Sequence, residues 1–203
     1  KNLHEVPDKV ELVVLITPSH FIYDIMEDLS KRMEEKNDIK AIVCAAAGYA
    51  ETNTKEGIAK QEVLMKTARK YGIRVMGPNC IGVIDRYNKV DTTFVETHLS
   101  QQDKGEPGGI SFISQSGAVA ASILMEGDSQ PVPMQFNKFL SIGNMADVDF
   151  IDLLEYLEDD ENTKVIGIYM EGYPQAKKLI KTMARIAKKK PIVVLKVGKS
   201  EKG

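Results

Sequence analysis

The chain has 203 residues, 43% of them hydrophobic and 28% charged, and a net charge of −2 at pH 7. This composition is typical of a globular protein and gives no reason to expect nucleic acid or an acidic membrane surface as a partner. No apolar run is long enough to span a bilayer, and no segment at the start resembles a signal peptide. Cys44 and Cys80 lack metal-ligand spacing, so the sequence predicts buried thiols in a reducing cytoplasm and no metal site.

The first half of the chain alternates continuous apolar runs with amphipathic helical patterns. The runs predict strands, the first two of them buried on both faces, at residues 11–17, 39–46 and 73–76. Apolar side chains at helical spacing predict the intervening helices at residues 21–36 and 57–71. Gly72 is a natural stop for the second of these helices.

A second alternating series follows a segment without a clear pattern. Residues 85–107 are rich in Thr, Gln, Asp, Lys and Gly, which predicts a linker or crossover arm. After it, strands are expected at residues 110–113, 138–142, 165–170 and 191–197. The helices between these strands are expected at residues 118–126, 149–157 and 175–188.

Strands separated by helices predict parallel sheets with right-handed crossovers. The sequence therefore predicts an α/β fold with two parallel-sheet domains, at residues 1–105 and 106–203. The polar start and the abrupt end suggest an internal fragment of a longer protein.

Ligands of open parallel sheets bind beyond the carboxyl ends of the strands, and the turns expected there contain glycine or small polar residues. The turn at Ser114, Gln115, Ser116 and Gly117 joins a strand to a helix start, whose N–H groups attract anions. It is a candidate phosphate-binding turn, and the alternative is an ordinary serine cap. Glu171 follows another strand and is either an orienting carboxylate or a solvent-facing loop residue.

Other chemistries lack support in the sequence. No Ser-His-Asp order is persuasive, and the hydrolase elbow, the dinucleotide fingerprint and the Walker A loop are all absent. Cys80 is a candidate reactive thiol, although a packed small side chain is the simpler interpretation.

Four motifs occur in order along the chain: 77–82 (Gly-Pro-Asn-Cys-Ile-Gly), 113–117 (Ile-Ser-Gln-Ser-Gly), 142–149 (Ile-Gly-Asn-Met-Ala-Asp-Val-Asp) and 169–172 (Tyr-Met-Glu-Gly). Together they resemble the nucleoside-diphosphate-forming acyl-CoA synthetases, relatives of the succinyl-CoA synthetase α subunit. The resemblance implies a partial Rossmann-like CoA-binding domain followed by a flavodoxin-like ligase domain. It also implies a reversible reaction of a carboxylic acid, CoA and ATP or GTP through acyl phosphate and phosphohistidine.

The resemblance assigns roles to residues at the strand ends. Asn79 and Cys80 correspond to positions near the reaction centre, and Glu171 corresponds to the glutamate that steadies the phosphohistidine. The residues that correspond to the phosphoryl-binding helix start are Ser114, Ser116 and Gly117. Those that correspond to the loops lining CoA are Pro18, Ala45, Ala46 and Ala47.

The resemblance also implies what lies outside the chain. The family's phosphorylated histidine follows a segment like 196–203, and none of His4, His20 and His98 has its context. ATP or ADP and Mg are expected to bind mainly outside this chain, on an ATP-grasp portion that is a separate subunit or fused. A small carboxylic acid is the expected substrate, and Ala121, in place of a tyrosine of succinate-specific relatives, disfavours succinate.

The resemblance also leaves other functions open. The first alternative is a non-catalytic CoA- or nucleotide-sensing module of a fused acetyltransferase. A flavodoxin-like electron carrier is a further alternative, which the near absence of aromatic residues in the strand-end turns disfavours.

Overall fold

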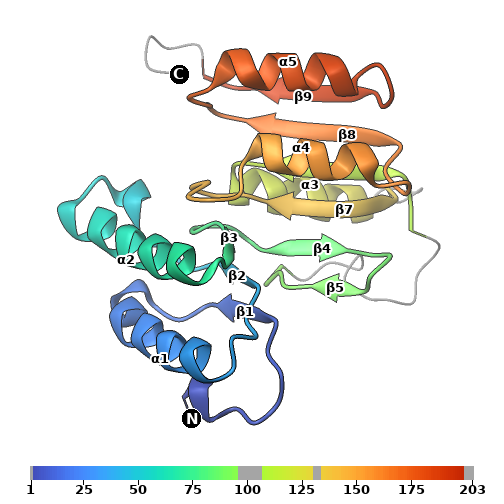
Figure 1. Cartoon of the computed structure of the whole chain (residues 1–203). Coiled ribbons are helices and arrows are strands. Elements are labelled where there is room, and N and C mark those ends of the chain that lie inside the picture. The colour runs from blue at the N-terminus through green and yellow to red at the C-terminus, as the bar shows by residue number, and fades with distance from the viewer. Residues whose placement is uncertain (1, 96–106, 130–133, 199–203) are drawn as a thin grey trace. The chain divides into compact units, whose positions relative to one another are not determined.

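The structure is a computed structural model that describes residues 2–95, 107–129 and 134–198. It divides into two compact units, and each contains a β-sheet with helices (Figure 1). The first unit consists of Lys1–Cys80 and Asn144–Val148, and the second consists of Ile81–Gly143 and Asp149–Gly203. The domain boundary expected between residues 105 and 106 lies outside the described residues.

The first unit is built on a three-stranded parallel sheet with the strand order β1-β2-β3. Its strands are β1 (Leu12–Leu15), β2 (Ala41–Cys44) and β3 (Arg74–Met76). Its helices are α1 (Ile22–Glu35) and α2 (Lys55–Tyr71), with short 3-10 helices η1 (Leu3–Glu5), η2 (Ser19–Phe21) and η3 (Ala50–Thr52). The strands and helices predicted for this half of the chain are therefore confirmed.

The core of the first unit follows the predicted apolar spacing. Ile22, Met26 and Leu29 of α1 are at most 2% exposed and pack with strand side chains such as Ile42. The helix α2 ends at Gly72, whose φ of +67° suits a residue without a Cβ atom.

One face of the edge strand β1 is partly exposed, so the expectation that this strand is buried on both faces was wrong. Leu12 is 39% exposed and Val14 is 38% exposed. An apolar run does not show whether both faces of a strand are covered, because that depends on which elements pack against the sheet.

A segment from the second half of the chain completes the first unit. The backbone N–H groups of Asn144, Ala146 and Val148 donate to the carbonyl oxygens of Pro78, Gly77 and Val75 at 2.9–3.1 Å. The segment Asn144–Val148 thus lies along β3 and its following turn.

The second unit contains a six-stranded sheet with the order β5-β4-β7-β6-β8-β9. Its strands are β4 (Val83–Asp85), β5 (Val90–Asp91), β6 (Ile110–Ser114), β7 (Phe136–Ser141), β8 (Val165–Met170) and β9 (Ile192–Lys196). The strands β7, β6, β8 and β9 run parallel, as predicted, whereas β4 pairs antiparallel with β7 and β5. Part of the expected arm is therefore sheet, since the short hairpin β4–β5 pairs its backbone with β7.

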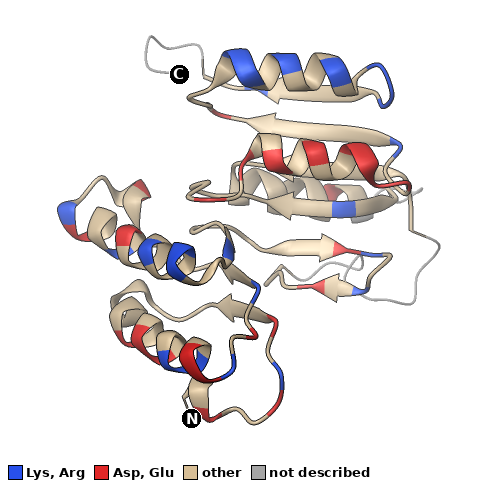
Figure 2. Cartoon of the chain, viewed as in Figure 1, with Lys and Arg blue, Asp and Glu red and all other residues tan. Residues whose placement is uncertain are grey.

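Three helices connect the parallel strands of the second unit: α3 (Gly117–Ser129), α4 (Phe150–Asp159) and α5 (Ala176–Ile186). Because β6 lies between β7 and β8, right-handed crossovers place α3 and α4 on opposite faces of the sheet (Figure 1). The helix α4 contains several acidic residues, and α5 contains several basic residues (Figure 2). Arg185 of α5 forms an ion pair with Glu158 of α4, and its Nη2 lies 3.5 Å from Glu155 Oε1, so the two helices pair across their contact.

In the part of the chain that the structure describes, no helix has the length and apolar character that crossing a bilayer requires.

Candidate functional site

The predicted phosphate-binding turn lies at the carboxyl end of β6, where α3 begins. Ser114 is fully buried, and its hydroxyl donates to the carbonyl oxygen of Ser116 at 2.7 Å. The hydroxyl of Ser116 accepts a bond from the N–H of Val119 at 3.4 Å. The first N–H groups of α3, beginning at Gly117, have no acceptor within the helix. The turn therefore has the local geometry of a helix N-terminus that can bind an anion.

Gln115 joins this turn to the turn after β8. Its backbone N–H donates to the carbonyl oxygen of Tyr169 at 3.1 Å. Its side-chain Oε1 accepts bonds from the N–H groups of Glu171 and Gly172 at 2.8 and 3.1 Å. One side chain thus holds the backbone of Glu171 beside the serine turn, because β6 and β8 are neighbours in the sheet.

The motif at residues 113–117 includes Gln115, but the family resemblance assigns no role to this residue. Its place between two serines at a strand end is the one feature of the sequence that could have indicated a role. Its hydrogen-bond partners could not be predicted, because they lie more than 50 residues further along the chain. The carboxylate of Glu171 is exposed at this edge.

The residues predicted to line CoA gather at the carboxyl edge of the first sheet. The N–H groups of Ala45 and Ala46 donate to the carbonyl oxygen of Leu15 at 2.9 and 3.3 Å. The loop after β2 is therefore bound to the end of β1, which precedes Pro18. Pro18 and Ala47 are exposed, so small side chains leave the backbone of this edge open to approach.

Asn79 also joins this edge. Its N–H donates to the carbonyl oxygen of Ala46 at 3.0 Å, and its side-chain Nδ2 donates to Asn144 Oδ1 at 3.4 Å. Its φ of +58° is a left-handed conformation that asparagine tolerates better than most residues. Two of the four motifs, at Asn79 and Asn144, therefore meet in the first unit.

Glu51 and Gln61 complete the cluster, and sequence reasoning missed both. Asn144 Nδ2 donates to Glu51 Oε2 at 2.6 Å and to Gln61 Oε1 at 3.0 Å. Glu51 Oε1 accepts bonds from the N–H groups of Gly48 and Tyr49 at 2.5 and 3.0 Å. No sequence signal could have found these contacts, since the residues joined to Asn144 lie 83 and 93 positions away.

The two cysteines lie within the first unit and are both buried. Cys80 Sγ donates to the carbonyl oxygen of Cys44 at 3.4 Å. Burial raises the pKa of Cys44 to about 11, so its thiol stays protonated at neutral pH. The burial of both thiols favours the interpretation of Cys80 as a packed side chain over that of a reactive thiol.

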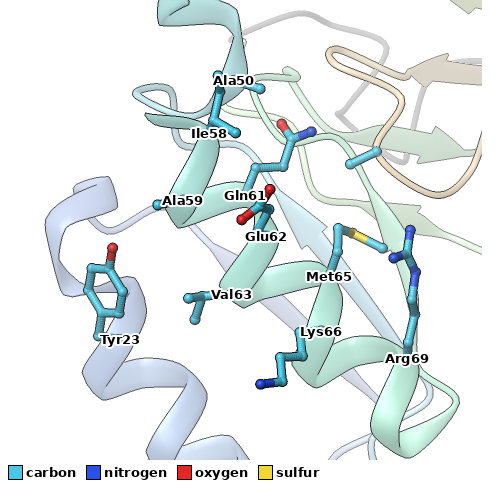
Figure 3. A pocket seen from close by; sticks show the side chains of 11 residues that line it. Tyr23, Ala50, Ile58, Ala59, Gln61, Glu62, Val63, Met65, Lys66 and Arg69 are labelled. Atoms are coloured by element: carbon cyan, nitrogen blue, oxygen red, sulfur yellow. The ribbon is translucent and has the colours of Figure 1, made fainter. Parts of the chain in front are cut away.

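A groove of about 750 Å³ runs along α2 and is also lined by Tyr23 of α1. Figure 3 shows Lys66 and Arg69 along one part of the groove and Ile58 along another. Gln61 lines this groove and also contacts Asn144, so the groove adjoins the polar cluster.

Two family models match the chain. The CoA binding domain matches residues 1–86, and the succinyl-CoA ligase like flavodoxin domain matches residues 107–203. The two matches follow the order that the resemblance implies and cover most of the described elements.

Relatives with known names match the whole chain. The α subunit of acetate–CoA ligase [ADP-forming] II from Pyrococcus furiosus is 36% identical over 203 residues, and the chain covers 41% of it. Acetate–CoA ligase [ADP-forming] from Methanocaldococcus jannaschii is 35% identical, with all of this chain and 26% of the relative covered. The chain thus spans about two fifths or less of the length of these relatives.

A solved structure agrees with the sequence matches. The dinucleotide forming acetyl-coenzyme A synthetase 1 of Ca. Korarchaeum cryptofilum, in complex with phosphate and ADP, matches with a TM-score of 0.83 and 31% identity. The match covers 100% of this chain and 40% of the other. The chain belongs to the ADP-forming acyl-CoA synthetase family, as a CoA-binding domain joined to a flavodoxin-like ligase domain.

Proposed function

We propose that the chain is the α-type portion of an acyl-CoA synthetase that interconverts a carboxylic acid, CoA and ATP with acyl-CoA, ADP and phosphate. The reaction passes through acyl phosphate and phosphohistidine. The observation that carries the proposal is the contact of Gln115 with the backbone N–H groups of Glu171 and Gly172, because it joins the start of α3 to the turn that carries the Glu171 carboxylate.

The second unit carries the residues for phosphoryl binding. Ser114, Ser116 and Gly117 form the turn whose backbone N–H groups bind the phosphoryl group, and the buried hydroxyl of Ser114 holds the turn through the carbonyl oxygen of Ser116. Backbone N–H donors in fixed positions stabilise negative charge as it develops on a transferring phosphoryl group. Glu171 accepts the N–H of the phosphorylated imidazole, which a segment outside this chain supplies.

The first unit carries the residues for CoA binding. Pro18 and the alanines at 45–47 offer small side chains at the strand ends, which fits a ligand that approaches the backbone closely. CoA supplies the thiol that takes the acyl group, and Asn79 lies at the same edge, where it orients the reacting end.

The remaining parts of the enzyme lie elsewhere. An ATP-grasp portion, as a separate subunit or fused, binds ATP or ADP with Mg. The relatives' names point to acetate, and a small carboxylic acid of this kind is the substrate. The enzyme works in the cytoplasm, without nucleic acid or membrane. None of the relatives reported above supports the alternative of a sensing module of a fused acetyltransferase.

The proposal is tested in the enzyme assembled from this chain's full-length protein and its ATP-grasp portion. Steady-state ADP release from ATP, beyond the single equivalent that accompanies phosphorylation of the histidine, should require both CoA and a small acid such as acetate. Release that ignores CoA, or that is absent with every acid tried, would contradict the proposal.

The variant Gln115→Leu tests the contact that joins the two turns. It removes the acceptor for two N–H groups, so Glu171 should move and kcat should fall about 10- to 100-fold, with KM for CoA unchanged. Gln135→Leu, at an exposed glutamine of the same unit, is the matched control and should retain activity. Equal kcat values in the two variants would mean that the joined turns are not part of the site.

A further inference from the structure

The loop after β2 is held by a carboxylate. Glu51 lies in η3, directly after this loop, and is partly buried. Its Oε1 accepts the N–H groups of Gly48 and Tyr49, so one oxygen fixes two successive peptide groups. Gly48 has a φ of +98°, and a Cβ atom there would lie 2.4 Å from the hydroxyl of Ser19. The loop is therefore held in a conformation that brings it close to the turn after β1.

The second oxygen of Glu51 extends the same network to the turn after β3. Its Oε2 accepts the Nδ2 group of Asn144, whose Oδ1 accepts the side chain of Asn79. Burial alone would raise the pKa of Glu51, but the hydrogen bonds that it accepts outweigh burial and hold the pKa below 4.5. The side chain is thus an anion at neutral pH, and each of its oxygens meets only donors.

We propose that Glu51 is a positioning residue for CoA, an inference that rests on the proposed function. It does not touch the ligand. It fixes the loop that presents Ala45, Ala46 and Ala47, and it couples that loop to Asn79 through Asn144. An anion is required because the network supplies donors on both sides of the side chain.

The variant Glu51→Gln tests this requirement with little change in shape. A glutamine has one acceptor oxygen, so either orientation of its amide places an NH₂ group against a donor of the loop or of Asn144. In the assembled enzyme, KM for CoA should rise about tenfold while kcat stays within about twofold, because a charge-assisted hydrogen bond is lost away from the reacting atoms. KM for the acid should not change.

Hydrogen exchange provides a readout that does not depend on turnover. The N–H groups of Gly48 and Tyr49 should exchange faster in Glu51→Gln than in the wild type. The control Glu35→Gln, at an exposed carboxylate at the end of α1, should change neither KM nor exchange in this loop.

A second variant covers the case in which Glu51→Gln does not fold. Asn144→Ala breaks the link to Asn79 but leaves the bonds of Glu51 to the loop, so KM for CoA should rise less, by about threefold. An unchanged KM for CoA in a folded variant would overturn the role of Glu51 while the proposed function stands. A wild-type enzyme without CoA-dependent ADP release would overturn both, and the two failures are therefore distinguishable.

Discussion

At the scale of single residues, a buried arginine ties the start of the chain to the first unit. Arg32 is fully buried, and its Nη2 lies 2.6 Å from Asp38 Oδ2. Its remaining donors reach the carbonyl oxygens of Leu3, Val6 and Asp8 at 2.6–3.0 Å. A buried guanidinium is stable only when its charge and its N–H groups are all matched, so this pair defines where residues 3–8 lie.

Asp38→Asn should destabilise the first unit by about 3–5 kcal/mol, because it leaves the charge of Arg32 buried without its counterion. Urea unfolding measured through the exchange of first-unit amides would test this value. Asp24→Asn, at an exposed carboxylate of α1, is the control. A loss below about 1 kcal/mol would fit a solvent-exposed pair instead and would contradict the buried geometry.

The same pair predicts a pH dependence. The hydrogen-bonded guanidinium of Arg32 holds the pKa of Asp38 well below its ordinary value of 3.8. Because the folded pKa is lower than the unfolded pKa, the pair stabilises the fold above pH 3.8, and this stability is lost as the pH falls further. Asp38→Asn should remove this acid sensitivity.

At the scale of elements, the hairpin β4–β5 is joined to the second sheet by a buried ion pair. Lys138 of β7 is 2% exposed and lies opposite Asp85 of β4 in the antiparallel register. Its Nζ is 3.1 Å from Asp85 Oδ2 and 3.3 Å from Asp160 Oδ2. Burial alone would lower the pKa of Lys138, but the hydrogen bond and charge of Asp85 outweigh it and raise the pKa. A slip of one residue would separate the pair, so Lys138 helps to define the register.

Lys138→Met should destabilise the second unit by about 3 kcal/mol, since two partly buried carboxylates then lose their cation. Amide exchange should rise first in β4, whose pairing the lysine supports. The control Lys181→Met, at an exposed lysine of α5, should change neither the stability of the second unit nor amide exchange in β4. Unchanged protection of β4 would mean that backbone pairing alone holds the hairpin.

At the scale of the whole molecule, the two units are interleaved along the chain. The chain enters the second unit at Ile81, returns to the first for Asn144–Val148 and leaves it again at Asp149. Asp147 Oδ2 accepts bonds from the N–H of Val75 at 2.8 Å and from Arg74 Nε at 2.9 Å. The stability of the first unit therefore depends on a residue from the second half of the sequence.

Asp147→Ala should thus destabilise the first unit by about 1–2 kcal/mol and leave the second unit unchanged, because it removes two acceptor contacts of β3. Amide exchange resolved along the chain would separate the two effects. Asp159→Asn, at an exposed carboxylate of α4, is a control from the same half of the sequence. Faster exchange confined to residues 81–143 would contradict the interleaved arrangement.

The sequence by itself determined the alternation of strands and helices, and with it the parallel sheets and the strand-end turns. Apolar periodicity is a local property, so Ile42, Leu29 and Ile113 are readable as core from their neighbours alone. The location of the serine turn and of Glu171 at strand ends was also predictable, but that the strands β6 and β8 are neighbours was not.

Only the tertiary structure decided which distant side chains meet at those edges. The exposure of β1, the antiparallel β4 and the return of Asn144 to the first unit all depend on how distant segments pack, which no local pattern encodes. The contacts of Gln115 and Glu51 were not predicted for the same reason. A hydrogen bond between residues tens of positions apart leaves no periodic pattern in the sequence. Their roles follow from donors and acceptors that must be matched where the chain folds back on itself.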